Sequence, residues 1–357
     1  MGLRMLLAAR ATRIAHVLVV EAEGSSRIRM VAEAAVIRRG WQLATSPAEA
    51  DVLLSCGTPG SELQTAMDHV WEQIPGPRAR VTAQSSNDVT PALESARREL
   101  LDDRSQRTDA RNRQTVPPDP NEHATMSHDD SGSGDSGMDM DMAPDGIALA
   151  ESGPDTDGLD LDVLHVPLGP VLAHWPAGLV LECTLQGDLI VGADARWLDS
   201  TSMRVEFDDV DDESSDPRWT AAQYCDDTAR LLSVAEWNGA ADAARQIRDG
   251  LLDAAPVDRC VRELDALAAR VARNRIFDWC LRGITVPGPC GENQELFTLP
   301  ARWLSAAAAG LDGRDALTST PRLAAGDVGE LVTGLDLASA RMVVAGLALH
   351  PDENAGA

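Results

Sequence analysis

The stretch from His165 to Trp197 constrains the fold more than any other part of the sequence, because it predicts a β-hairpin. Leu179–Leu185 and Leu189–Ala195 are two runs of residues that favour strands. The Gly-Asp pair between them is typical of a tight type II′ turn. A lead-in rich in Gly and Pro predicts an extended, turning approach to the first strand. Since an isolated hairpin is only marginally stable in water, we expect the helical segments that follow to cover it.

The first hundred or so residues alternate strand-like and helix-like patterns. His16–Val20 and Asp51–Ser55 are continuous apolar runs, which are typical of buried parallel strands. Further strands are predicted at 41–44 and 78–83, and helices at 28–36, 61–74 and 91–103. Strands that alternate with helices predict an α/β N-terminal domain built on an open parallel sheet.

Three loops follow the predicted strands, at the edge where ligands of such sheets bind. They are Glu21–Ser26, Cys56–Thr58 and Gln84–Asn87. Gly24-Ser25-Ser26 precedes a helix and would offer backbone N–H groups to a phosphate. The chain has neither a G-x-G-x-x-G motif nor a P-loop, however, and two glutamates in the first loop would repel an anion. Ordinary loop and helix-capping chemistry is therefore the favoured interpretation.

Composition excludes several classes of partner. The formal net charge is −26, and all 31 basic residues are arginine. A charge of this sign predicts no nucleic-acid binding and disfavours adhesion to an anionic membrane. The six cysteines are scattered without a C-x-x-C pair, which predicts reduced thiols in a cytoplasmic protein. No segment reaches about 18 apolar residues, and the apolar start is shorter than a signal peptide, so we expect no direct membrane span.

The sequence predicts two domains, at 1–103 and 163–350, with a disordered linker at 104–162 between them. A mobile tail is predicted at 351–357. The linker is rich in Asp, Ser, Gly and Pro and has no aromatic residue, so burial cannot offset its ordering entropy. Its histidine, methionine and carboxylate side chains would suit weak binding of Cu or Zn. The alternative is a solvated acidic tether with no defined site. The candidate metal ligands are His123, Met126, His128, Asp129, Asp130, Met138, Asp139, Met140, Asp141 and Met142.

The hairpin at 179–195 is followed by a helical region at 219–282. Within it, three amphipathic helices are predicted, at 219–235, 239–252 and 257–281. Short links between them predict an antiparallel bundle, so the C-terminal domain is α+β, with a β-hairpin or small sheet packed on helices. Further helices are expected near 300–309 and 335–349. Six arginines lie along the third helix. They would bind an acidic partner or the acidic linker, and the alternative is that they form an ordinary solvated face. They are Arg259, Arg262, Arg270, Arg273, Arg275 and Arg282.

The segment SPAEADVLLSCGTPGSELQTAMDHVWEQIPGPRARVTAQSS, residues 46–86, resembles the iron–sulfur subunit of respiratory complex I and the related small subunit of [NiFe] hydrogenases. The shared pattern is a strand after Ala-Asp, a loop, a helix ending in Gln-x-Pro-x-Pro-Arg, and another strand. In that family the strand-end loops supply cysteines to a [4Fe–4S] cluster, which needs four thiolates. Cys56 is the only thiol here, and Ser85-Ser86 stands where a cysteine is expected. The resemblance therefore implies the fold without an iron–sulfur cluster, and no cofactor is expected.

The second half resembles the front portion of the large quinone-site subunit of complex I, which is related to the [NiFe] hydrogenase large subunit. The matching features are Gly169-Pro170, the LVLECTLQGDLIVGA hairpin, and ARLLSVAEW…ARQIRDGLL before a long Arg-rich helix. In that family a His-Gly step entering the first strand offers a histidine to the quinone. Here Ala177 precedes Gly178, and His174 lies three residues earlier beside Trp175. His174 and Trp175 are therefore the candidate quinone-binding residues, with a structural role as the alternative.

Three functional hypotheses follow from these features. The first is a non-catalytic structural or accessory subunit, related to the core subunits of complex I and hydrogenases, that docks in or assembles a membrane-associated redox complex. It predicts a cytoplasmic protein, held at the inner face of the plasma membrane by other subunits of that complex. The second is a quinone-binding oxidoreductase subunit that uses His174 or Trp175. The third is a metal-binding module built on residues 123–142.

Overall fold

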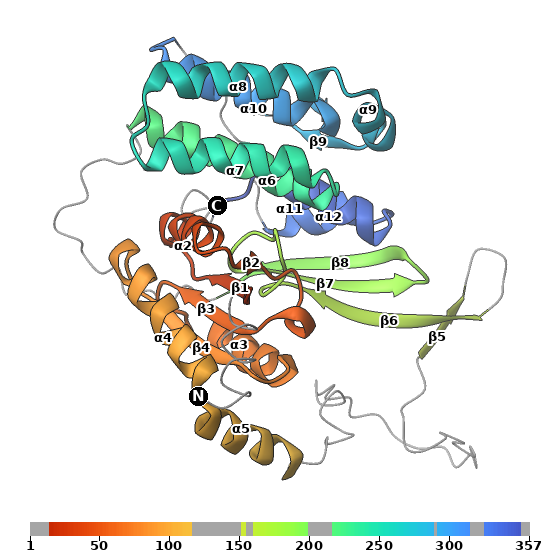
Figure 1. Ribbon diagram of the computed structural model, residues 1–357. Coiled ribbons are helices and arrows are strands. Elements are labelled where there is room, and N and C mark those ends of the chain that lie inside the picture. Colours follow the sequence, from red (N-terminus) through yellow and green to blue (C-terminus); the bar gives the residue numbers. More distant parts are fainter. Residues whose placement is uncertain are drawn as a thin grey trace.

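The computed structural model describes residues 14–115, 151–154, 160–198, 216–288, 291–314 and 325–350. An N-terminal half (the described residues up to 115) packs against a C-terminal half (those from 151 onward), as Figure 1 shows. The N-terminal half contains a parallel sheet, and the C-terminal half contains helices and small antiparallel sheets. The broad α/β prediction is therefore confirmed. None of the described helices has both the length and the apolar character needed to cross a bilayer.

The N-terminal sheet has the strand order β2-β1-β3-β4, and all of its pairings are parallel. Its strands are β1 (His16–Glu21), β2 (Gln42–Leu43), β3 (Val52–Cys56) and β4 (Ala79–Ala83). Every residue of the inner strand β3 is buried, as expected for a parallel strand covered on both faces. The helices of this half are α2 (Ser26–Arg38), α3 (Ser61–Gln73), α4 (Val89–Leu101) and α5 (Asp103–Thr115).

The two faces of this sheet are covered by different parts of the chain. α2 and α4 pack on the face that carries Val17, whereas α3 packs on the face that carries Leu18. On the α3 face, the side chains of Val171 and Leu198 from the C-terminal half pack into the same core. The N-terminal half therefore depends on the C-terminal half to complete one of its two hydrophobic cores.

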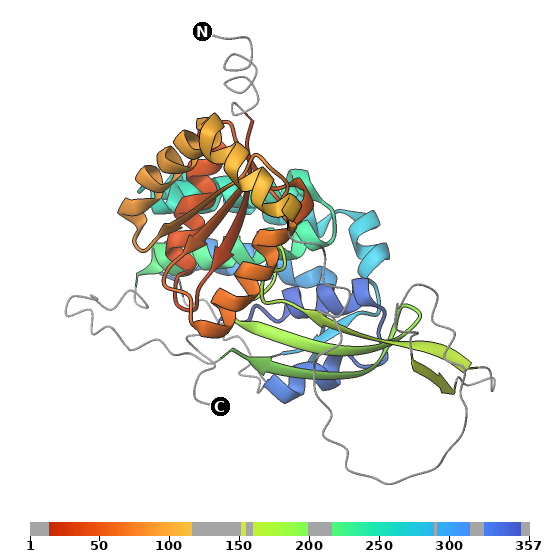
Figure 2. The same cartoon turned by 90° about the horizontal axis from the view of Figure 1, so that it is seen from below.

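The predicted hairpin is confirmed, because β7 (Leu179–Gln186) and β8 (Leu189–Trp197) pair in antiparallel fashion. Gly187 lies in the turn with φ +65°, a left-handed conformation that glycine adopts without steric cost. β6 (Asp160–Leu168) and β5 (Glu151–Pro154) extend the sheet beyond β7. Figure 2 shows β5 and the adjoining end of β6 projecting away from the rest of the molecule.

Helices pack with this antiparallel sheet to form the C-terminal core. They are α6 (Pro217–Val234), α7 (Asn238–Leu252), α8 (Val257–Ala272), α9 (Arg275–Leu281), α10 (Leu299–Leu311), α11 (Ala325–Val332) and α12 (Leu337–Gly346). Two short strands, β9 (Thr285–Pro287) and β10 (Asn293–Glu295), pair with each other. Figure 1 shows α2 lying between the parallel sheet and helices α6 and α7, so this helix is where the two halves meet.

One predicted helix is two helices in the structure. The pattern over 257–281 predicts a continuous helix, but α8 and α9 take its place. The side-chain oxygen of Asn274 accepts hydrogen bonds from the backbone N–H groups of Ile276 and Phe277, at 3.0 and 3.1 Å. Asn274 thereby caps a new helix, because its side chain satisfies N–H groups that have no partner within that helix.

The prediction that residues 104–162 form a disordered linker is wrong at both ends of that range. α5 continues from the N-terminal half to Thr115, although it has almost no apolar side chain. Polar contacts hold it, because Arg78 pairs with Asp109 at 2.9 Å and Gln106 donates to the Arg78 carbonyl at 2.8 Å. At the other end, β5 pairs with the first residues of β6. The prediction failed because it relied on apolar periodicity, which α5 lacks.

Several predicted features lie outside the described residues. They are the candidate metal ligands between His123 and Met142, Cys290, the apolar start of the chain and the tail at 351–357. The metal-binding hypothesis for residues 123–142 therefore stays a prediction.

Candidate functional site

The strand ends of the parallel sheet, where the family that residues 46–86 resemble holds its iron–sulfur cluster, carry one thiol. Cys56 lies at the end of β3, and burial raises the pKa of its thiol. Ser85, which stands where a cysteine is expected, donates its hydroxyl to Asp88 Oδ2 at 2.7 Å in a capping turn. The described residues contain no group of three or more side chains placed to ligate a metal. The donor set of these loops therefore does not fit a four-thiolate cluster.

A cavity of about 80 Å³ lies where the two halves meet. β1 and the end of β2 form one wall, residues 170–175 form another, and side chains of α2, α6 and α7 close it. Both sequence-predicted quinone residues, His174 and Trp175, line this cavity. A space of this size holds a few water molecules and is far smaller than the roughly 300–1,000 Å³ of typical organic-ligand pockets.

The indole N–H of Trp175 is engaged within the protein. It donates to the backbone carbonyl of Leu179 at 2.8 Å, and the side chain is buried. Gly169 lies against this pair, and a Cβ there would come within 2.3 Å of the Leu179 oxygen and 2.5 Å of Trp175 Nε1. Trp175 therefore fastens the loop at 169–175 to the first strand of the hairpin, which is a structural role.

The close approach at Gly169 gives a testable consequence. Gly169→Ala is expected to lower the free energy of unfolding by about 2–3 kcal/mol, since overpacking adds to the strain of a left-handed residue. Gly169 has φ +87° and Gly187 has φ +65°, but nothing lies within 4 Å of a Cβ at Gly187. Gly187→Ala is therefore the matched control, with strain alone and a cost of about 1 kcal/mol. Equal losses in urea unfolding of the two variants would contradict the packing argument.

His174 is a neutral ring beside the cavity at pH 7. Burial, together with the positive charges of Arg245 and Arg230, lowers the pKa of the His174 imidazole to about 4. Its backbone has φ +62°, a left-handed conformation that is uncommon for a residue with a Cβ. A neutral imidazole has one donor and one acceptor nitrogen. Of the two sequence-predicted residues, His174 is therefore the one whose side chain can donate and accept hydrogen bonds at the cavity.

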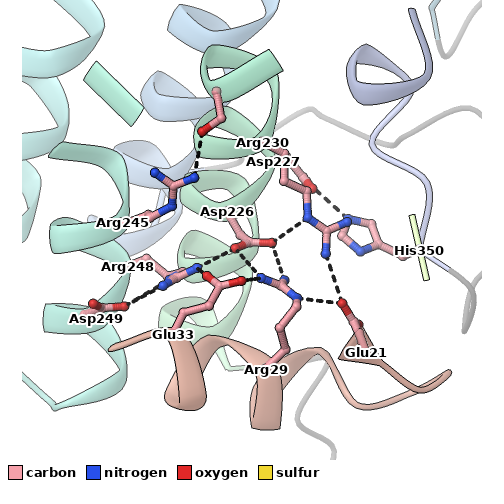
Figure 3. Close-up of polar contacts among 11 residues, drawn as sticks. Glu21, Arg29, Glu33, Asp226, Asp227, Arg230, Arg245, Arg248, Asp249 and His350 are labelled. Atoms are coloured by element: carbon pink, nitrogen blue, oxygen red, sulfur yellow. Dashed lines mark hydrogen bonds and ion pairs between the residues drawn. The ribbon is translucent and has the colours of Figure 1, made fainter. Parts of the chain in front are cut away.

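Beside the cavity, Asp226 of α6 is held by three arginines that come from both halves (Figure 3). Arg29 of α2 donates to it through both Nη atoms, at 2.5 and 3.2 Å. Arg248 Nη1 and Arg230 Nε lie 2.7 and 3.1 Å from its oxygens. The Asp226 side chain is 2% exposed, and burial by itself raises its pKa. The guanidinium groups of Arg29 and Arg230 outweigh that effect and hold the pKa of Asp226 well below its usual range.

Two glutamates complete this arrangement. Glu33 accepts hydrogen bonds from Arg29 Nη1 at 2.7 Å and Arg248 Nη1 at 2.6 Å. Glu21 accepts from Arg29 Nε at 2.6 Å and Arg230 Nη2 at 3.1 Å. Although burial raises the pKa of Glu33, Arg29 and Arg248 lower it to about 2. We call these residues the charged junction cluster: Glu21, Arg29, Glu33, Asp226, Arg230 and Arg248 (Figure 3).

The charged junction cluster joins the two halves across a desolvated interface. Three of its members lie on β1 and α2, and three lie on α6 and α7. Each carboxylate bonds to at least two guanidinium groups, so its charge is balanced although burial removes most of its contact with water. Removing one partner from a buried ion pair leaves an uncompensated charge, which costs several kcal/mol. Two exposed pairs, Arg38–Asp253 at 3.1 Å and Arg196–Glu62 at 3.0 Å, also link the halves.

Sequence reasoning missed this cluster, although one signal was present. Asp226 lies in a helical pattern four residues after Ala222 and three before Ala229, so it shares one side of the helix with these apolar residues. A charged residue on an apolar helix face indicates a buried partner, because an unpaired buried charge is too costly. The partner itself was out of reach, since Arg29 and Asp226 are 197 residues apart in the chain.

The chain matches no known protein-family profile, no curated protein and no solved structure. The fold and the site themselves define a two-part protein, in which a parallel α/β half and a sheet-and-helix half are joined by buried ion pairs.

Proposed function

We propose that this chain is a non-catalytic structural subunit that docks in, or helps to assemble, a membrane-associated redox complex. The observation that carries the proposal is the charged junction cluster. Its three carboxylates are bonded to arginines of both halves, at 2.5–3.1 Å for the closest contact of each pair. A catalytic acid or base must instead exchange its proton with a ligand within hydrogen-bond reach.

The redox-complex part of the proposal rests on the resemblance of residues 46–86 and of the hairpin segment to complex I and hydrogenase core subunits. A scaffold that lacks the thiols for a cluster loses electron transfer but keeps a shape that partners can bind. Because no described helix is suited to cross a bilayer, the proposal assigns the membrane part to other chains.

Purification of the tagged full chain from its native cells, under anaerobic conditions, tests this proposal. We expect recovery of membrane-bound redox subunits with the chain, and iron well below one atom per chain after the partners are removed. Stoichiometric iron with a [4Fe–4S] spectrum would overturn the non-catalytic assignment. Recovery of the chain without any redox subunit would overturn the docking assignment.

A quinone-binding oxidoreductase subunit is the second candidate, and one observation favours it. Both predicted residues, His174 and Trp175, line the junction cavity. The size of the cavity and the engaged Trp175 indole oppose it, so we expect a short-chain quinone to cause no saturable change in tryptophan fluorescence. A saturable change that is lost in His174→Ala and kept in His165→Ala would support quinone binding, because His165 is exposed on β6 and bonds to Thr184.

A further inference from the structure

α9 presents the two most exposed large apolar side chains of the described residues. Trp279 is 75% exposed and Ile276 is 73% exposed. They lie three residues apart and so share one face of the helix, whereas Phe277 and Leu281 are buried. The Phe277 ring packs against Trp237 with 5.5 Å between the ring centroids. α9 therefore packs on the helical core, at one end of the helical layer in Figure 1. Its exposed apolar face consists of Ile276 and Trp279.

Arginines flank these two side chains in the sequence. From Arg270 to Arg282 the chain has four arginines and one carboxylate, Asp278, which pairs with Arg282 at 2.8 Å. Arg273 and Arg275 are both exposed. This segment of the chain is therefore net positive, opposite in sign to the net charge of −26 of the whole chain, and Glu295 lies at its end, where it accepts from the Gly283 N–H at 3.1 Å. We call the following residues the α9 patch: Arg273, Arg275, Ile276, Trp279 and Arg282.

We propose that the α9 patch docks onto an anionic lipid surface. A tryptophan side chain favours the boundary between headgroups and acyl chains, because it combines a large apolar ring with a polar N–H group. Ile276 adds apolar area on the same face, and the arginines beside it match the phosphate groups of anionic lipids. The contact is peripheral, since a short amphipathic helix enters the headgroup boundary without crossing the bilayer.

The overall negative charge predicts repulsion from such a surface, but screening limits its reach. The Debye length at physiological ionic strength is about 8 Å, so the groups on the patch act at close range while distant carboxylates do not. A protein partner is less well matched to this surface. Two apolar side chains at the end of a seven-residue helix supply far less than the roughly 800 Å² that each partner buries in a stable protein interface.

Vesicle flotation of the full chain tests the proposal, with phosphatidylcholine vesicles compared to vesicles that also contain phosphatidylglycerol. We expect binding only to the anionic vesicles, and weaker binding as the salt concentration rises. Arg273→Glu with Arg275→Glu should weaken the partition at least about 25-fold, at roughly fivefold for each arginine. Ile276→Ser with Trp279→Ser should weaken it about tenfold or more.

Matched controls separate the patch from general effects. Arg104→Glu with Arg107→Glu makes the same change of charge on exposed positions of α5, and Leu164→Ser with Val191→Ser removes exposed apolar side chains from the sheet. Both control pairs should leave vesicle binding unchanged. Circular dichroism should show that all four variants are folded.

A fluorescent label on Cys280 reports the same contact from the patch itself. Cys280 is exposed, while Cys56, Cys183, Cys225 and Cys260 are buried, so a Cys290→Ser background directs the label to this position. We expect a blue shift of a polarity-sensitive label with anionic vesicles. No binding, equal binding to neutral vesicles, or self-association that depends on Trp279 would each overturn the proposal. The vesicle assay uses the chain alone, so its outcome is independent of the partner recovery that tests the proposed function.

Discussion

Replacing Asp226 with asparagine is expected to lower the free energy of unfolding by about 3–5 kcal/mol. Asparagine keeps the shape of the side chain but removes the charge that Arg29, Arg230 and Arg248 share. Their positive charges then stay buried without full compensation, which is the costly outcome for a desolvated ion pair. Equilibrium urea unfolding, followed by circular dichroism and tryptophan fluorescence, measures the loss. Both signals should shift together, because the cluster joins the two halves.

Asp242→Asn is the matched control for this experiment. The Asp242 side chain is 61% exposed and makes one ion pair, with Arg245 at 3.0 Å. An exposed pair of this kind contributes about 1 kcal/mol or less, so the control variant should unfold close to the unchanged protein. A loss below about 1 kcal/mol in Asp226→Asn would show that the charged junction cluster does not hold the halves together.

Acidification is expected to lower the free energy of unfolding by up to about 3 kcal/mol between pH 6.5 and 4, through the His174 imidazole alone. Its pKa in the folded protein is about 4, against an ordinary value of 6.5. Between these values the unfolded chain binds a proton that the folded chain does not, so acid favours unfolding. The contribution of His174 to the free energy of unfolding is fully present above pH 6.5 and falls as the pH approaches 4.

Burial of the His174 ring, followed by the charged groups near it, sets this pH window. Arg245, Arg230 and Arg341 disfavour its protonated form, and Glu33 opposes them. The contribution of Glu33 itself is lost at lower pH, from 4.5 down to about 2, so the two effects overlap little. In His174→Asn the slope between pH 6.5 and 4.5 should flatten, since Asn tolerates a left-handed backbone and does not titrate. His165→Asn, at an exposed position, should keep the slope of the unchanged protein. A similar flattening in both variants would contradict the assignment.

Local pattern was enough for most of the fold. The apolar runs at β1 and β3, the helical spacing in α3, and the Gly-Asp turn between β7 and β8 each depend on neighbouring residues. Prediction failed where a polar contact decides the structure. The helix α5 is held by Arg78, and the break before α9 is made by the Asn274 cap. Neither contact changes the apolar periodicity that a pattern can detect.

The candidate site divides in the same way. His174 and Trp175 were predicted from the resemblance of the hairpin segment to the quinone-site subunit, and both residues line one cavity in the structure. It also shows that the Trp175 indole is engaged by Leu179, which a pattern of residues does not reveal. From the sequence, Arg29 and Arg248 look like ordinary charged residues of surface helices. Only the structure shows that both are buried and paired with carboxylates.

The sequence alone determined the alternation of strands and helices in the N-terminal half, the hairpin that begins the C-terminal core, and the single thiol among the strand-end loops. These follow from composition and from periodicities that act over a few residues. Only the tertiary structure decided which charges meet at the junction and that the second half completes a core of the first. Those contacts join residues as far as 215 positions apart. They form only once both halves have folded and buried their charged groups against each other.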